Sequence, residues 1–117
     1  MSELTQMMCV PCRGGEPPLD VREISELGRE TPGWNVIEVE GIKRLERVFK
    51  FKNFVEALDF TRRIGELAES QGHHPALLTE YGKVTVTWWT HKIRGLHKND
   101  FIMSARTTDL YDSLRAA

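Results

Sequence analysis

The stretch NFVEALDFTRRIGELAESQG, residues 53–72, decides the fold because it carries the strongest helix pattern in the chain. Asn53 is placed to cap the helix, and Glu56 three residues later completes the arrangement of a capping box. Gly72 stands where a helix commonly ends in the left-handed conformation. One apolar stripe at helical spacing is predicted to face the core: Phe54, Ala57, Leu58, Ile64, Leu67 and Ala68. A helix with one apolar face needs a sheet or other helices to cover it.

Two strand patterns precede this helix. The segments 34–39 and 42–51 are rich in β-forming residues, and Glu40-Gly41 between them predicts a turn. Arg47 falls on the core-facing parity of the second segment, which indicates either a β-bulge or an arginine whose stem is buried. The two segments are therefore expected to be paired strands.

Two more strand patterns follow the helix. A short apolar piece, 76–78, and the segment 83–91 lie on either side of the turn Tyr81-Gly82. The alternation in the longer segment predicts Val84, Val86 and Trp88 on one face and Thr85, Thr87, Trp89 and His91 on the other. In this prediction His91 ends the last strand, on its polar face.

Shorter helices are predicted at both ends of this arrangement. Asp20 can cap the first of them, and Pro32-Gly33 stops the chain from continuing as a helix. His97 occupies the N-cap position of the last helix, with Asp100 as its third residue. The order α-β-β-α-β-β-α predicts an α+β fold, a four-stranded antiparallel sheet with three helices packed on one face.

Length and composition bound the function. The chain has 117 residues, which suits one domain; residues 1–18 are predicted to be a flexible N-terminal arm and residues 19–117 the folded domain. A net charge of −1 argues against direct binding of nucleic acid or an anionic membrane. With no signal peptide or membrane span, and only Cys9 and Cys12 as cysteines, a cytoplasmic location is the default expectation.

Three histidines are the candidate chemical groups. His73-His74-Pro75 follows the end of the long helix, and His91 ends a strand, so the three are placed to meet at one edge of the sheet. Imidazole has an unperturbed pKa of about 6.5, which lets it give and take protons near neutral pH. Taken alone, however, His73 and His74 also fit a solvated turn, and His91 fits a solvent-exposed residue at a strand end. Asp100 likewise fits an ordinary helix start, and the tryptophans fit packing residues.

The spacing of the histidines with other residues carries a resemblance. Glu69, His73-His74-Pro75, Tyr81, His91 and Asp100 are spaced as in the signature of the pterin-4a-carbinolamine dehydratase family. The resemblance extends from Pro32-Gly33-Trp34-Asn35 through Gly95-Leu96 to Asn99-Asp100-Phe101. It implies the fold that the periodicity predicts.

The resemblance also implies an activity and roles for residues. Members of the family remove water from a 4a-hydroxytetrahydropterin to give quinonoid dihydropterin, which recycles the pterin of aromatic amino acid hydroxylases, without a metal or cofactor. His73 and His91 would transfer protons, and His74 would bind and orient the pterin. The other implied substrate contacts are Pro75, Thr90, Lys92 and Trp34, with Glu69 and Asp100 as supporting residues. Such proteins form homodimers or homotetramers, and a hydroxylase is an expected partner.

Two alternative hypotheses remain open at this point. The same fold includes a dimerisation cofactor of a transcription factor, so the chain could act as a binding or regulatory module that buries Phe60 or Leu110 between subunits. Cys9 and Cys12 also form half of a structural zinc site. The histidines could complete that site only if the arm folds across them.

Overall fold

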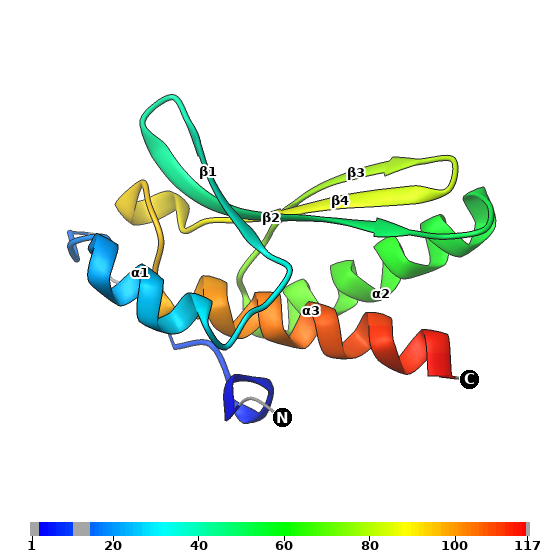
Figure 1. Ribbon diagram of the computed structural model, residues 1–117, viewed down its shortest axis with the longest axis horizontal. Helices are drawn as coiled ribbons and strands as arrows, with labels where there is room; N and C mark the ends of the chain where they lie inside the picture. The colour runs from blue at the N-terminus through cyan, green and yellow to red at the C-terminus, as the bar shows by residue number, and fades with distance from the viewer. Residues whose placement is uncertain (1–2, 11–14, 117) are drawn as a thin grey trace.

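Two antiparallel hairpins lie side by side and form one four-stranded sheet, and the helices gather on one face of it (Figure 1). The computed structural model describes residues 3–10 and 15–116. The strands are β1 (Asn35–Val39), β2 (Ile42–Lys50), β3 (Ala76–Glu80) and β4 (Lys83–Trp88). The helices are α1 (Val21–Gly28), α2 (Phe54–Gln71) and α3 (Lys98–Ala116), with 3-10 turns η1 (Glu3–Gln6) and η2 (His91–Ile93). The strand order is β1-β2-β4-β3, all antiparallel, so the predicted fold class is confirmed.

The helix ends follow the capping chemistry of the sequence. Asp20 and Glu23 form a reciprocal capping box at the start of α1. Asn53 caps α2 by accepting the backbone N–H of Glu56 at 2.9 Å. Gly72 ends α2 with φ 63°, a conformation that glycine adopts without steric cost. These local signals explain why the predicted position of α2 is correct to within a residue.

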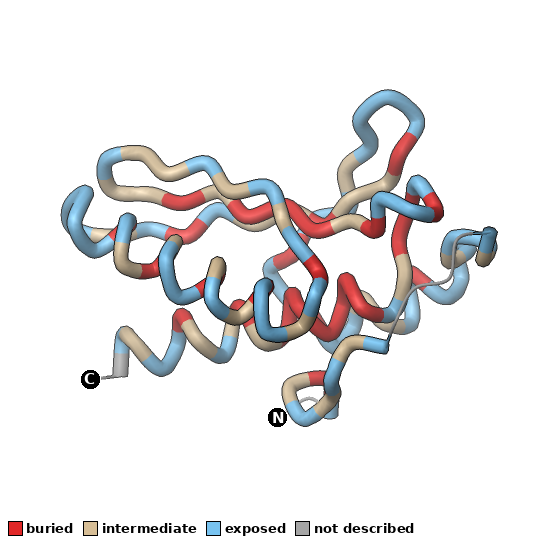
Figure 2. Tube along the Cα trace, turned by 180° about the vertical axis from the view of Figure 1, so that it is seen from behind, coloured by how far each residue is buried: buried red, intermediate tan, exposed pale blue. Residues whose placement is uncertain are grey.

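The core lies between the inner face of the sheet and the helices. Val84, Val86 and Trp88 are fully buried, as the alternation of β4 predicts. The buried segments in Figure 2 follow the central strands and α3. Arg47 pairs in an unbroken ladder with Val86, so its core-facing position needs no bulge. Its guanidinium lies 4.6 Å from the centre of the Phe49 ring and covers that edge of the core.

Three details differ from the sequence expectation. β4 ends at Trp88, so His91 does not end a strand; it begins the turn η2. Phe54 and Leu58 are exposed, because the buried stripe of α2 runs through Ala57, Phe60, Ile64 and Ala68. Phe60 therefore packs inside the core of a single chain, where it touches Phe49 and Phe51, and does not lie between subunits.

The described part of the N-terminal segment packs on the domain. Leu4 in η1 is 1% exposed and belongs to the main hydrophobic core, next to α3. Thus residues 3–10 lie against the fold, although the sequence alone offers them no partner. Among the residues that the structure describes, no helix has the length and apolar character required to cross a membrane.

Candidate functional site

The histidines of the sequence prediction line one pocket. Its volume is about 550 Å³, and it opens at the end of α2, beside η2 and the start of α3. Its lining residues are Cys9, Val10, Gln71, Gly72, His73, His74, Thr90, His91, Lys92 and Asn99. The fold thus brings His73, His74 and His91 together, as their positions in the chain predict.

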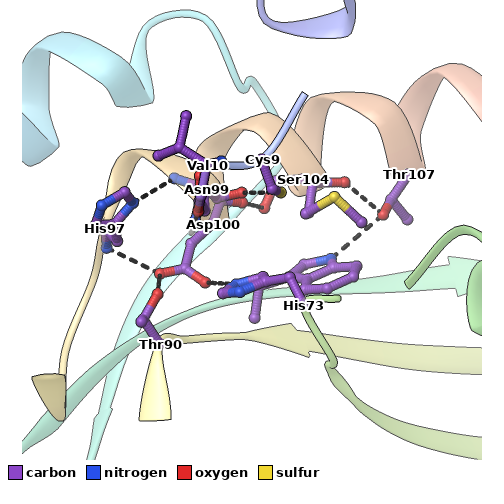
Figure 3. A network of polar contacts seen from close by, with 11 residues as sticks. Cys9, Val10, His73, Thr90, His97, Asn99, Asp100, Ser104 and Thr107 are labelled. Atoms are coloured by element: carbon purple, nitrogen blue, oxygen red, sulfur yellow. Dashed lines mark hydrogen bonds and ion pairs between the residues drawn. The ribbon is translucent and has the colours of Figure 1, made fainter. Parts of the chain in front are cut away.

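His73 is the most firmly held of the three. Its Nε2 lies 2.6 Å from Oδ1 of Asp100, and both side chains are buried (Figure 3). Its ring stacks on Trp88 at 5.7 Å between centroids and 7° between planes. Trp88 is itself fixed, because its Nε1–H donates to Oγ1 of Thr107. Carboxylate and indole together fix both the direction and the plane of the imidazole.

Asp100 joins three segments at this point. Its Oδ2 accepts the hydroxyl of Thr90 at 2.7 Å and the backbone N–H of His97 at 2.9 Å. His97 in turn caps α3, because its Nδ1 accepts the backbone N–H of Asn99. Asp100 is therefore both an acidic residue of the first helical turn and the partner of His73. A carboxylate that already accepts two other hydrogens also serves as an acceptor for His73 Nε2–H.

His91 reaches the pocket from a short loop after β4. Thr90 and Gly95 form an isolated antiparallel bridge, so the chain between them closes on itself and carries η2. The His91 ring stacks on Trp89 at 4.6 Å between centroids. The guanidinium of Arg44 lies 4.0 Å from the centre of the Trp89 ring. The tryptophan that shares the face of His91 in the sequence pattern thus contacts it directly.

His74 lies at the open rim of the pocket. Its Nε2 pairs with Oε1 of Glu69 on α2, and both side chains are largely exposed. An exposed pair of this kind orients a ring more than it stabilises the fold. Lys92 and Thr90 also line the pocket, whereas Pro75, which follows His74, is not among its lining residues.

Two residues of the sequence argument lie elsewhere. Trp34 packs edge-on against Phe49 in the core, and its Nε1–H donates to Thr108 at 2.8 Å. It is not among the residues that line the pocket, so a contact between Trp34 and the pterin stays a prediction. Tyr81 lies 76% exposed at the turn between β3 and β4.

The sequence argument misses the contribution of the N-terminal segment and of two amide side chains. Cys9, Val10, Gln71 and Asn99 line the same pocket as the histidines. The pKa of the Cys9 thiol is raised to about 11, first by burial and then by the nearby Asp100 carboxylate. The Cys-x-x-Cys motif marks this segment in the sequence but does not indicate where it lies.

The zinc hypothesis depends on the same segment. Cys9 lines the same pocket as the three histidines, as the hypothesis requires, but Cys12 falls outside the described residues. Among the residues described, no three His, Cys, Asp or Glu side chains are grouped as metal ligands.

Known proteins are similar to this chain in sequence. Residues 17–110 match the family model described as pterin 4 alpha carbinolamine dehydratase. A Nitrosococcus oceani protein, provisionally named a pterin-4-alpha-carbinolamine dehydratase, is 59% identical over 110 residues, covering 94% of this chain and 97% of its own length. A Microcystis aeruginosa protein of the same provisional name is 56% identical over 111 residues, covering 95% and 96%.

Solved structures agree with this match. A Brucella melitensis crystal structure, titled transcriptional coactivator/pterin dehydratase, superposes with a TM-score of 0.72 at 32% identity, covering 80% of this chain and 98% of that one. A pterin dehydratase-like protein, described as a RuBisCO assembly factor in the alpha-carboxysome, shares the fold with a TM-score of 0.57 at 19% identity, covering 68% of this chain and 89% of that one.

Proposed function

The chain belongs to the pterin 4 alpha carbinolamine dehydratase family, and on this premise we propose that it removes water from a 4a-hydroxytetrahydropterin to give the quinonoid dihydropterin. The observation that carries the proposal is the pocket lined by His73, His74 and His91, in which a buried carboxylate holds one imidazole. The reaction would return the oxidised pterin of an aromatic amino acid hydroxylase to a form that can be reduced again.

The reaction asks for two proton transfers at one small ring. The hydroxyl on C4a leaves with its bonding electrons and takes up one proton to become water. The hydrogen on N5 leaves as a proton, and its electron pair forms the C4a–N5 double bond. One acid and one base on the two sides of the ring therefore suffice, and neither oxidation nor reduction occurs.

His73 is proposed as the base. Since Asp100 accepts a hydrogen from Nε2, the neutral ring is left with an unprotonated Nδ1, and none of the described residues hydrogen-bonds Nδ1. The carboxylate also stabilises the imidazolium that forms when Nδ1 takes a proton, as in other His–Asp pairs. The stack on Trp88 keeps the ring in place while this happens.

His91 is proposed as the acid, and the remaining polar residues as the binding set. His91 lines the same pocket from a different segment, η2, which would let it donate a proton to the departing hydroxyl while His73 takes the proton of N5. His74 at the rim, fixed by Glu69, would orient the pterin together with Thr90 and Lys92. Substrate contact by Pro75 stays a prediction of the family resemblance.

A role through partners is a second candidate function. Phe54, Val55 and Leu58 are large apolar side chains exposed on α2, and such a patch suits contact with another protein surface. We propose that the chain forms a homodimer or homotetramer in the cytoplasm and is able to associate with a hydroxylase. Light scattering of the purified protein measures its mass in solution; a monomer at micromolar concentration would contradict the assembly.

The test of the activity is the decay of a freshly generated 4a-carbinolamine, followed by its ultraviolet absorbance. Wild-type protein is expected to accelerate the decay in proportion to its concentration. His73→Ala and His91→Ala are each expected to slow the catalysed decay by roughly 10²–10⁴-fold, which is the usual contribution of a general acid or base to the rate. Lys98→Ala serves as the control, because Lys98 is exposed at the start of α3 and does not line the pocket. A wild-type rate equal to that of buffer would sink the proposal.

A further inference from the structure

The Cys9–Val10 segment lines the histidine pocket, although the family match begins only at residue 17. We propose that this segment, clamped onto α2 and α3 by Gln71 and Asn99, is a wall of the pterin pocket that sets the affinity for the ring. The inference rests on the proposed function for the identity of the ligand. It assigns part of the affinity to Cys9 and Val10, which precede the residues that match the family model.

The clamp is built from two amide side chains. Asn99 accepts the backbone N–H of Val10 at 3.0 Å and donates to the backbone carbonyl of Val10 at 2.7 Å. Gln71 accepts the backbone N–H of Cys9 at 3.0 Å. The amide of Asn99 thus pairs with the main chain as a neighbouring strand would. Because Asn99 is almost fully buried, releasing the segment would leave its amide without these partners.

The clamp residues are close neighbours of His73 and Asp100 in the chain. Gln71 is the last residue of α2, two positions before His73, and Asn99 directly precedes Asp100. In Figure 3 Asp100 lies between the Cys9–Val10 segment and the His73 ring. Upstream, Leu4 is buried in the core, and Arg106 on α3 donates to the carbonyl of Met7 at 3.5 Å. The segment is therefore held at several points along its length.

The Cys9–Val10 segment is expected to contribute packing contacts to the ligand and no reactive group. Burial and Asp100 keep the Cys9 thiol protonated at neutral pH, because its pKa is about 11, so it is a poor nucleophile. Val10 is 57% exposed and places an apolar side chain at a pocket whose other lining residues are mostly of polar types. Binding sites for flat heterocycles combine such apolar contact with a few polar groups that fix orientation.

A wall of this kind predicts a separation of KM from kcat. If substrate binds well only to the docked arrangement, its apparent affinity falls in proportion to the docked fraction. Saturating substrate then restores docking, so the turnover of the bound complex is unchanged. If the segment acted only by holding His73 or Asp100 in place, releasing it would instead lower kcat.

The experiment compares clamp variants in the full chain. Asn99→Ala removes both contacts to Val10, whereas Val10→Pro removes the N–H donor together with the valine side chain and fixes φ at this position. Val10→Ala keeps the N–H and isolates the effect of the side chain, and Met8→Ala, at an exposed neighbouring position, is the control. Asn99→Ala and Val10→Pro are each expected to raise KM at least tenfold and to leave kcat within twofold. The dissociation constant for a stable 7,8-dihydropterin should rise by the same factor.

Alkylation of Cys9 reports docking independently of turnover. In a Cys12→Ser background Cys9 is the only thiol, and iodoacetamide at pH 8 should modify it slowly in the wild-type arm and faster when Asn99 is replaced. Faster alkylation with an unchanged KM, unchanged alkylation, or a loss of kcat at constant KM would each overturn the inference. If wild-type protein fails to dehydrate the carbinolamine yet binds the dihydropterin in a clamp-dependent way, the proposed function falls and the inference stands.

Discussion

Asp100 serves the helix and the pocket with one carboxylate. One oxygen accepts the His97 backbone N–H at the start of α3, and the other lies against His73 Nε2. An acidic residue in the first turn of a helix is common for electrostatic reasons alone, so the local sequence cannot separate the two roles. Only the fold, which brings residues 73 and 100 together, reveals the second.

Replacing Asp100 by Asn tests this pair. The amide can donate a hydrogen to Nε2 of His73, which moves the ring hydrogen to Nδ1 and removes the proposed base. We expect kcat to fall by roughly 10²–10⁴-fold, with a smaller change in KM. Steady-state kinetics measures the loss, and thermal unfolding checks the fold. Ser104→Ala, which removes a buried hydroxyl one turn further along α3, should keep most of the activity; a wild-type kcat in Asp100→Asn would refute the role of the pair.

Trp89 is a positioning residue for His91. The two rings stack at 4.6 Å, with Arg44 against the indole. Trp89→Ala is expected to lower kcat by roughly tenfold or more, because small misplacements of a catalytic group are costly. Trp89→Phe should recover much of the loss, since a phenyl ring can still stack. Equal kcat in the alanine variant and the wild type would show that the stack does not matter.

At the scale of elements, the loop between Thr90 and Gly95 is where sequence reasoning fails. The alternation of residues between the two faces of the predicted strand continues in the sequence through His91, yet β4 ends at Trp88. The chain turns back because Thr90 pairs with Gly95 and Arg94 adopts a left-handed conformation at φ 52°. These are tertiary constraints with no local signature.

Any side chain at Gly95 is expected to destabilise the protein. A Cβ there would lie 2.7 Å from Cβ of Pro18, so one of the two segments must move. Gly95→Ala should lower the free energy of unfolding by about 1–3 kcal/mol, as overpacking does, and should reduce kcat by displacing His91.

Gly65→Ala is the matched control, because a Cβ at this position of α2 meets nothing within 4 Å. It should stabilise the protein by up to ~1 kcal/mol through helix propensity. Urea unfolding measures both effects. A Gly95→Ala protein as stable as the control would contradict the close packing.

The predicted helices and strands are otherwise confirmed, because their signals are local. Capping by Asn53 and termination at Gly72 define α2, and alternation defines the buried face of β4. Phe60 lies at helical spacing from Ala57 and Ile64, so the periodicity is compatible with its burial. The exposure of Phe54 and Leu58 could not be predicted, because it depends on how much of the apolar surface of α2 the neighbouring elements cover.

At the scale of the whole molecule, the described part of the N-terminal segment, residues 3–10, contributes to both the core and the pocket. The sequence predicts a flexible arm at residues 1–18, because glycine and proline break its periodicity. In the structure Leu4 completes the core, and residues 9 and 10 line the pocket. Such long-range contacts span some 90 positions in sequence and leave no periodic trace.

Leu4→Ala tests whether the arm belongs to the folding unit. Leu4 is buried in the main core, so its truncation should lower the free energy of unfolding by about 2–5 kcal/mol. Urea titration followed by tryptophan fluorescence measures this, with exposed Met8→Ala as control. A change below about 0.5 kcal/mol, the scale of ordinary surface substitutions, would mean that the arm is dispensable for stability.

The site could be predicted in part. The spacing of Glu69, His73, His91 and Asp100 identifies the cluster, and the structure brings these histidines to one pocket. The roles assigned to them stay predictions. Trp34 lies in the core and Cys9, Val10 and Asn99 in the pocket because both placements depend on how distant segments pack.

The most direct test of the central claim is the dehydration rate of the His73→Ala, His91→Ala double variant, measured against each single variant and against buffer. If these two imidazoles share the two proton transfers, the double variant should stay folded by circular dichroism and approach the uncatalysed rate. Its loss should be smaller than the product of the single losses, as for groups that act as one unit. Turnover near that of the wild type in the double variant would contradict the account.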